Sequence, residues 1–296
     1  MTGRDDNLEA LRRAVLENRA KKMLAERQQV NRRERIPAAA RGGRLPLSWS
    51  QQRLWFLDQL DHGAGGAYLV PAALRLSGDL DKAALKASLD RIVARHENLR
   101  TSFASDLDGP YQVIAAADAG FALQEHDLGG LEGDGQDAAV RELIEAESAR
   151  PFDLACDRLI RGMLLRLSDT EHILCITQHH IISDGWSRSV FVREIVALYT
   201  AFSQRQPDPL PALPLQYADY AIWQREWLQG ETLRKQLDFW RAQLDGAPAL
   251  LELPADRARP AVRSYAGGAI ALRLPAALSD ALRALSASTT CSNGKS

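Results

Sequence analysis

The chain is expected to be an α/β protein, because apolar strands and amphipathic helices follow one another along it. Residues 173–177 form an apolar run that is typical of a buried strand. Residues 159–167 alternate in character and would pair with that run as an antiparallel hairpin, with a turn at residues 169–171. Residues 188–204, which follow this hairpin, repeat apolar side chains at helical spacing.

The composition excludes several classes of protein. A chain of 296 residues can form one large domain or two ordinary ones, and 46% hydrophobic with 25% charged residues is typical of soluble globular proteins. A net charge of −1 argues against a nucleic-acid partner, and no stretch is apolar enough to cross a membrane. The polar N-terminus lacks a signal-peptide core, which predicts a cytoplasmic protein. The three cysteines lack metal-site spacing, and their odd number argues against a disulfide framework.

The N-terminal region, residues 1–36, is predicted to form a basic amphipathic helix. Ten Lys or Arg residues stand against six Asp or Glu residues over positions 1–35, and apolar residues between Leu8 and Leu24 keep a helical spacing. This helix is either a solvated leader or a docking segment that grips another chain through its apolar stripe. Residues 37–46 are rich in proline, alanine and glycine and are interpreted as a linker.

The next elements are justified by their spacing and by their end signals. Residues 48–57 are interpreted as a core helix with a polar face that includes Gln51 and Arg53. Asp79 or Asp81 is placed to cap the helix that follows. Further elements are expected as strands at residues 68–70, 73–76 and 111–114, and as helices at residues 85–93 and 138–149.

Residues 95–103 are expected to turn from a helix end into a strand. Three neighbouring side chains there, Arg95, His96 and Glu97, are charged or titratable. Apolar residues follow them at Leu99 and Phe103. We interpret the paired Arg and Glu as part of a structural ion network rather than as reacting groups.

The last third of the chain contains aromatic-rich helices. Four prolines between residues 207 and 214 indicate an extended connector. A helix is expected from Tyr217 through Trp227, and another through Trp240. Residues 269–274 are strand-like, and a helix begins at Leu278. Residues 286–296 have no apolar face and are expected to form a disordered tail.

The candidate site is the segment His179–Ser187, where the apolar strand opens into a loop. Neighbouring side chains of an extended segment point to opposite faces, so His179 and His180 are expected to have different tasks. Asp184 is interpreted as a partner for an arginine, and Trp186 as a core residue. Gly185 is expected because a side chain would obstruct the turn, and Ser187 is a candidate N-cap for the following helix.

Four stretches in this order resemble the condensation domains of nonribosomal peptide synthetases. The segments that carry the resemblance are Ser48–Leu57, Arg95–Phe103, His179–Ser187 and Tyr217–Trp223. Gln178 departs from the methionine that the family often places before the two histidines. The signature residues outside the histidine segment are Gln51, Arg53, Arg95, His96, Arg100, Tyr217, Asp219 and Trp223.

The resemblance implies two chloramphenicol-acetyltransferase-like lobes, each with a mixed sheet and flanking helices. Residues 47–225 would form the N-terminal lobe, and residues 226–285 the crossover and the beginning of a second, similar lobe. Because the remainder of that second lobe is not in the sequence, the chain is expected to be a truncated condensation domain.

By the same resemblance, the reaction joins an upstream acyl or peptidyl thioester to the amine of a downstream aminoacyl thioester. Both substrates would be carried on the phosphopantetheine arms of donor and acceptor carrier domains, and the domain itself would bind no cofactor and no metal. His180 would be catalytic and His179 would support it. Asp184 would be a structural ion-pair residue, and Gly185 would lie nearest the thioester. Ser183 and Trp186 would complete the supporting set.

The subtype and the alternatives follow from the same segment. Cyclising relatives carry aspartates in place of His179 and His180, which argues against heterocyclisation. The sequence of residues 183–187 resembles that of the subtype that accepts an L-configured donor. The alternative interpretation is a starter domain that accepts a fatty acyl group. The N-terminal segment would dock onto an upstream synthetase subunit. The remaining alternatives are an inactive fragment that serves only as a docking module, and a relative of the epimerisation domains.

Overall fold

The computed structural model describes residues 35–60, 66–251, 254, 270 and 272–288. The chain divides into two compact units, Met1–Leu253 and Pro254–Ser296.

A mixed four-stranded sheet forms the centre of the first unit, in the order β2-β7-β6-β5. Strands β2 (Leu69–Ser77), β7 (Glu171–His179) and β6 (Ile160–Arg166) pair antiparallel, whereas β5 (Leu123–Asp127) runs parallel to β6. The predicted hairpin of β6 and β7 is confirmed, with Arg166 opposite His172 next to the turn.

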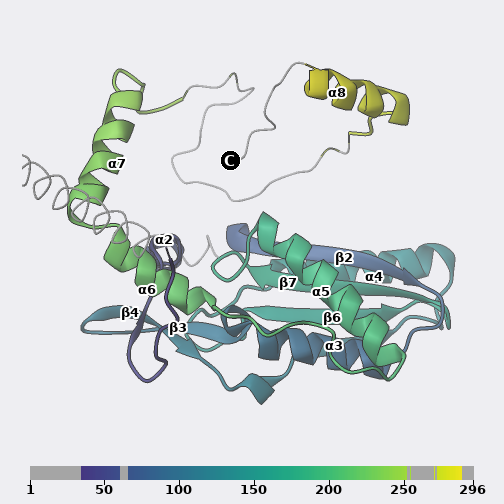
Figure 1. Ribbon diagram of the computed structural model, residues 1–296. Helices are drawn as coiled ribbons and strands as arrows, with labels where there is room; N and C mark the ends of the chain where they lie inside the picture. The colour runs from purple at the N-terminus through teal and green to yellow at the C-terminus, as the bar shows by residue number, and fades with distance from the viewer. Residues whose placement is uncertain (1–34, 61–65, 252–253, 255–269, 271, 289–296) are drawn as a thin grey trace, which may run out of the picture. The chain divides into compact units, whose positions relative to one another are not determined.

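Helices cover both faces of this sheet (Figure 1). Helices α3 (Lys82–Arg95) and α5 (Gly185–Ser203) pack side by side on one face, and α4 (Gly133–Ala149) packs on the other. Alternate residues of the central strands point to the two layers, as strand geometry requires. The layer under α3 and α5 contains Ile160, Leu164, Leu174 and Ile176, and the layer under α4 contains Met163, Leu165, Ile173 and Cys175.

A second sheet has the order β1-β4-β3 and includes part of the segment that was interpreted as a linker. Strand β1 (Leu45–Pro46) pairs antiparallel with β4 (Gly109–Ile114), which pairs with β3 (Thr101–Asp106). Leu45 is buried, and the Gln112 amide donates to the Pro46 carbonyl over 2.7 Å. The linker interpretation of residues 37–46 is wrong at this end, because pairing and burial fix the backbone there.

Helix caps and short helices connect the layers. Asp81 caps α3 by accepting the Ala84 N–H over 2.9 Å, which confirms one of the two predicted caps. Among its described residues, the first unit also contains α2 (Trp49–Leu60), η2 (Glu97–Arg100), η3 (Ala117–Ala119), α6 (Tyr217–Trp227) and α7 (Gly230–Gln243).

Helix α2 differs from the core helix that was predicted, because it buries polar side chains. Gln51 and Asp58 are buried, while Trp49 and Phe56 are exposed. Gln51 finds hydrogen-bond partners inside the fold, and such partners remove the cost of burying an amide.

The second unit contains α8 (Ala276–Ser288). The helix continues to Ser288, so the tail predicted from residue 286 begins too early, and residues 289–296 lie outside the described residues. The described positions of the strand-like stretch, residues 270 and 272–274, are not in a strand. Residues 1–34, which include most of the predicted N-terminal helix, also lie outside the described residues.

Candidate functional site

The two histidines lie where β7 ends, and they differ sharply in exposure. His179 is 1% exposed, whereas His180 is exposed at the rim of a cavity. The backbone of the His180 residue is fixed, because its N–H donates to the Tyr68 carbonyl over 2.8 Å. His180 lies in the turn just after β7, and the difference in exposure between the two side chains agrees with the expectation that they have different tasks.

The neutral imidazole of His179 stabilises the turn. Its Nδ1 accepts the Ile181 N–H over 3.1 Å, so the ring proton is on Nε2. Burial lowers the pKa of His179 to about 4, and the neighbouring His180 adds to this effect. The ring also contacts Tyr68 and Phe152, with centroids 6.3 and 6.4 Å away. His179 is therefore suited to supporting the turn and unsuited to carrying a proton near neutral pH.

The cavity beside His180 has a volume of about 520 Å³ and is built from distant parts of the chain. Helix α2, the η2 turn, the histidine segment and the start of α6 each supply wall residues. The polar side chains on the wall besides His180 include Arg53, Asn98, Ser183, Asp184 and Tyr217. This arrangement places one accessible imidazole in a polar cleft that is large enough for a small acyl or aminoacyl group.

Asp184 caps helix α5, and the prediction that it pairs with an arginine is wrong. Its Oδ1 accepts the Ser187 N–H over 2.7 Å and the Ser187 hydroxyl over 2.6 Å. These hydrogen bonds lower the pKa of Asp184. Among the ion pairs of the described residues, none involves Asp184. The carboxylate takes the capping role that was predicted for Ser187, because it precedes the first turn and can accept both donors.

Gly185 and Trp186 also differ from the expectations. Gly185 is the first residue of α5, its backbone is outside the left-handed region, and no atom lies within 4 Å of where a Cβ would stand. A side chain would therefore not obstruct the turn. Gly185 lines a separate cavity between β2, β7 and α5. Trp186 is 82% exposed and is not a core residue.

Residues 95–97 all form ion pairs, but with partners outside the stretch: Arg95 and His96 pair with Glu194, and Glu97 pairs with Arg41. Glu194 of α5 accepts from Arg95 Nε over 3.2 Å and lies 2.6 Å from His96 Nε2. The Glu194 side chain was not predicted as a partner, because it stands among helical residues with no local signal. This contact ties the helix that follows the histidine segment to the end of α3.

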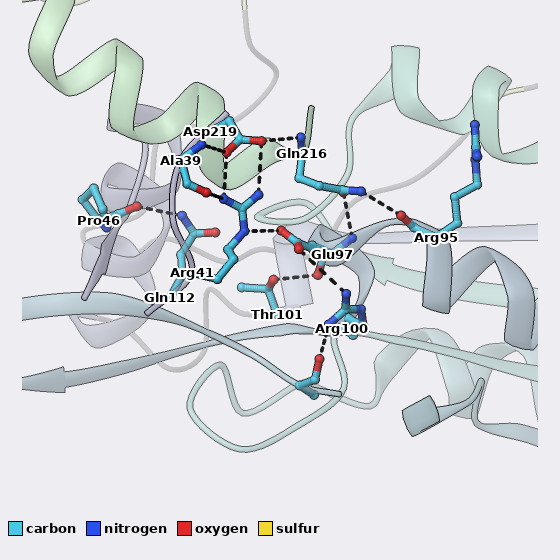
Figure 2. A network of polar contacts seen from close by, with 11 residues as sticks. Ala39, Arg41, Pro46, Arg95, Glu97, Arg100, Thr101, Gln112, Gln216 and Asp219 are labelled. Carbon is cyan, nitrogen blue, oxygen red and sulfur yellow. Dashed lines mark hydrogen bonds and ion pairs between the residues drawn. The ribbon is translucent and has the colours of Figure 1, made fainter. Parts of the chain in front are cut away.

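A second network, shown in Figure 2, surrounds Asp219 of α6. Arg41 forms two hydrogen bonds with the Asp219 carboxylate, at 2.7 and 3.1 Å, and a third with Glu97 at 2.9 Å. The backbone N–H groups of Ala39 and Gln216 also donate to Asp219. Burial acts to raise the pKa of Asp219, but these hydrogen bonds outweigh it and hold the value at about 2. Arg41 lies in the supposed linker, so sequence reasoning missed it.

The other signature residues occupy different kinds of position. Gln51 is buried and, with Tyr217, lines the His180 cavity; Tyr217 donates to, or accepts from, the Ser48 hydroxyl over 2.9 Å. Arg53 is exposed in the cavity. Arg100 hydrogen-bonds to the Ala115 carbonyl beside the second network. Trp223 stacks on Trp227, with ring centroids 5.3 Å apart, away from the His180 cavity.

Two absences are established for the part of the chain that the structure describes. No group of three or more His, Cys, Asp or Glu side chains there could hold a metal ion. No helix within the described ranges is long and apolar enough to span a membrane.

The mixed sheet, the covering helices and the two-histidine turn define a condensation domain of the nonribosomal peptide synthetase type. The family model of the condensation domain matches residues 42–293, and the chain belongs to this family.

Particular relatives agree with this assignment. The chain is 45% identical over 251 residues to malpibaldin synthetase of Mortierella alpina, covering 85% of this chain and 4% of the synthetase. The crystal structure of the X-domain from teicoplanin biosynthesis matches with a TM-score of 0.72 and 36% identity, covering 87% of this chain and 56% of that one. A complex of that X-domain with OxyB matches with a TM-score of 0.71 and 34% identity, covering 88% of this chain and 56% of that one. The chain thus spans about half of the solved domain and a small part of the synthetase.

Proposed function

We propose that the His180 cavity catalyses amide-forming condensation between two carrier-bound thioesters. The observation that carries the proposal is the difference in burial between the two histidine side chains. His179 is buried and neutral, and His180 presents its ring to a polar cavity of about 520 Å³. A site for direct acyl transfer needs one accessible group beside the attacking amine and a rigid turn to hold it.

In the proposed reaction the amine of the acceptor attacks the carbonyl carbon of the donor thioester. The C–N bond forms, the C–S bond breaks, and the departing sulfur takes up a proton. His180 orients the amine and accepts the proton that the amine loses. An α-amine with a pKa of about 8 is partly neutral near physiological pH, so orientation can contribute as much as proton transfer. The sequence lacks the nucleophile elbow of acyl-enzyme hydrolases, which favours direct transfer.

The proposed partners are a donor and an acceptor carrier domain, each presenting its substrate on a phosphopantetheine arm. The resemblance of the sequence of residues 183–187 to the L-donor subtype supports an L-configured donor. The upstream subunit would be engaged through residues 1–36, nearly all of which lie outside the described residues. Gly185, which was expected to lie nearest the thioester, lines a separate cavity and not the His180 cavity, so we assign it no role in the proposed reaction.

The experiment mixes the protein with an acyl-loaded donor carrier and an aminoacyl-loaded acceptor carrier and follows the acceptor by mass spectrometry. The acceptor is expected to gain the acyl mass with the wild-type chain and to lose that gain with His180→Ala. His126→Ala is the matched control, because His126 is half-buried on β5 and does not line the cavity. Equal product from wild type and His180→Ala would refute the proposal, as would folded wild-type protein that forms none.

A second candidate function is partner binding without turnover. It is favoured by the match to the teicoplanin X-domain, whose structure is known in complex with OxyB. A folded chain that forms no product but retains a carrier domain or another synthetase protein in a direct binding measurement would support this second candidate. Product that depends on His180 would exclude it as the sole function.

A further inference from the structure

Asn98 is the side chain that joins the η2 turn to the turn that carries His180. Its Nδ2 donates to the Ile182 carbonyl over 2.6 Å, two residues after His180. Asn98 lines the His180 cavity and also a smaller cavity of about 280 Å³ behind it. The amide therefore stands in the wall between the two cavities.

The other hydrogen bonds of the histidine turn come from the backbone or from the turn itself. The Ile182 N–H donates to the His179 carbonyl over 3.1 Å, and the Ile181 N–H donates to His179 Nδ1. Among the hydrogen bonds of the described residues, Asn98 supplies the contact from a distant side chain to the backbone of residues 180–183. Removing this contact would leave the Ile182 carbonyl without its partner.

The orientation of the Asn98 amide is determined by its neighbours. A carbonyl can only accept, so Nδ2 must face Ile182 and Oδ1 must face Gln51, whose Nε2 is 3.4 Å away. Gln51 is 1% exposed and accepts the Ser48 N–H over 3.0 Å. The Ser48 hydroxyl in turn bonds to Tyr217. A continuous chain of hydrogen bonds thus runs from α6 through α2 to the histidine turn.

We propose that Asn98 is a positioning residue that fixes the direction of the His180 ring, which deepens the proposed function and rests on it. The middle of the Arg95–Phe103 segment therefore acts on the reaction through the backbone of residues 180–183. A displacement of about 1 Å at a reacting group can reduce a rate by about a hundredfold, so the contact matters for turnover more than for folding.

The test compares Asn98→Ala and Asn98→Asp with the wild-type chain. The Asp variant keeps the size of the side chain but presents an oxygen to the Ile182 carbonyl. Gln136→Glu is the matched control, because Gln136 Nε2 donates to three carbonyls, those of Leu128, Leu131 and Leu167, far from the His180 cavity. Hydrogen exchange at the Ile181 and Ile182 amides is measured with urea unfolding, and condensation is measured with loaded carriers.

In both Asn98 variants, hydrogen exchange at the Ile181 and Ile182 amides is expected to be about tenfold faster than the change in global stability accounts for. A factor of about ten is the size expected when local opening becomes easier by the loss of one buried hydrogen bond. Their kcat is expected to fall about tenfold to a hundredfold, with KM for the carriers nearly unchanged. Gln136→Glu is expected to lower stability and leave kcat and the exchange of both amides as in wild type.

The two readouts separate the failure of this inference from the failure of the proposed function. Unchanged exchange in both variants refutes the anchoring by Asn98, whatever the activity. Faster exchange with unchanged kcat refutes the positioning role. Absence of product from folded wild type refutes the proposed function and the positioning role with it, and the exchange data then decide whether Asn98 anchors the turn.

Discussion

The Arg41–Asp219 contact gives a prediction whose size follows from the structure. The carboxyl of Asp219 is 2% exposed, and its pKa is held at about 2 against an ordinary value of 3.8. One pKa unit corresponds to about 1.4 kcal/mol, so the folded state gains about 2 kcal/mol from the ionised form of Asp219. Because the pKa is lowered on folding, this stabilisation is complete above the ordinary value of 3.8 and is lost as the pH falls toward 2.

The perturbation is Arg41→Met, which keeps the apolar stem and removes the guanidinium from the network in Figure 2. Breaking a buried pair leaves an uncompensated charge, so the free energy of unfolding near neutral pH is expected to fall by about 2–3 kcal/mol. Urea unfolding followed by tryptophan fluorescence measures the loss. The acid limb of stability is expected to become shallower in the variant, because Asp219 would no longer have so low a pKa.

The control is Arg44→Met, which removes a guanidinium from the same segment. Arg44 pairs with Asp106, whose side chain is 47% exposed, and exposed pairs contribute little. This variant is expected to keep nearly the wild-type stability. A loss in Arg41→Met no larger than that in Arg44→Met would refute the view that Arg41 fixes residues 37–46 to the lobe.

Three further outcomes are expected. Gly185→Ala should leave the free energy of unfolding unchanged or raise it by up to about 1 kcal/mol, because the Cβ site is open and the residue is helical; a clear loss in urea unfolding would contradict this. Gly162→Ala should lower it by about 1–3 kcal/mol, because a Cβ there would stand 2.7 Å from Phe121 Cε1 and 3.1 Å from the Cys175 carbonyl; wild-type stability would show that the core yields freely. As the pH falls from 6.5 to about 4, the unfolded chain protonates its histidine while His179 stays neutral, so stability should fall by about 3 kcal/mol. His179→Asn should flatten this slope, and an unchanged slope would locate the effect elsewhere.

The sequence predicted those features that depend on local pattern. Alternation along the strands predicted the β6–β7 hairpin and a difference between His179 and His180, which the structure shows as a difference in exposure. The cap at Asp81 followed from a short acceptor just before an apolar helix. Such signals lie within a few residues of the feature that they predict, so they can be found without tertiary structure.

The features that were missed depend on partners far apart in the sequence. Gln51 is buried because the Ser48 backbone and Asn98 satisfy it, so helix α2 turns a polar side chain inward. From the sequence alone, Glu194 is interpreted as a solvated charge. Its partners, Arg95 and His96, are brought beside it only by the packing of α5 against α3. Asp184 was expected to pair with an arginine, but its carboxylate accepts the capping hydrogen bonds from Ser187 instead.

Chemical modification of histidine tests, without requiring turnover, whether the His180 cavity receives a carrier-bound substrate. Diethyl pyrocarbonate is applied to the folded chain with an unloaded or an aminoacyl-loaded acceptor carrier, and modified peptides are quantified by mass spectrometry. Exposed His180 is expected to react and buried His179 to be spared, and the loaded carrier is expected to slow the modification of His180 severalfold while that of His126 is unchanged. Equal modification of His180 with the loaded and the unloaded carrier would show that the His180 cavity does not receive the carried substrate.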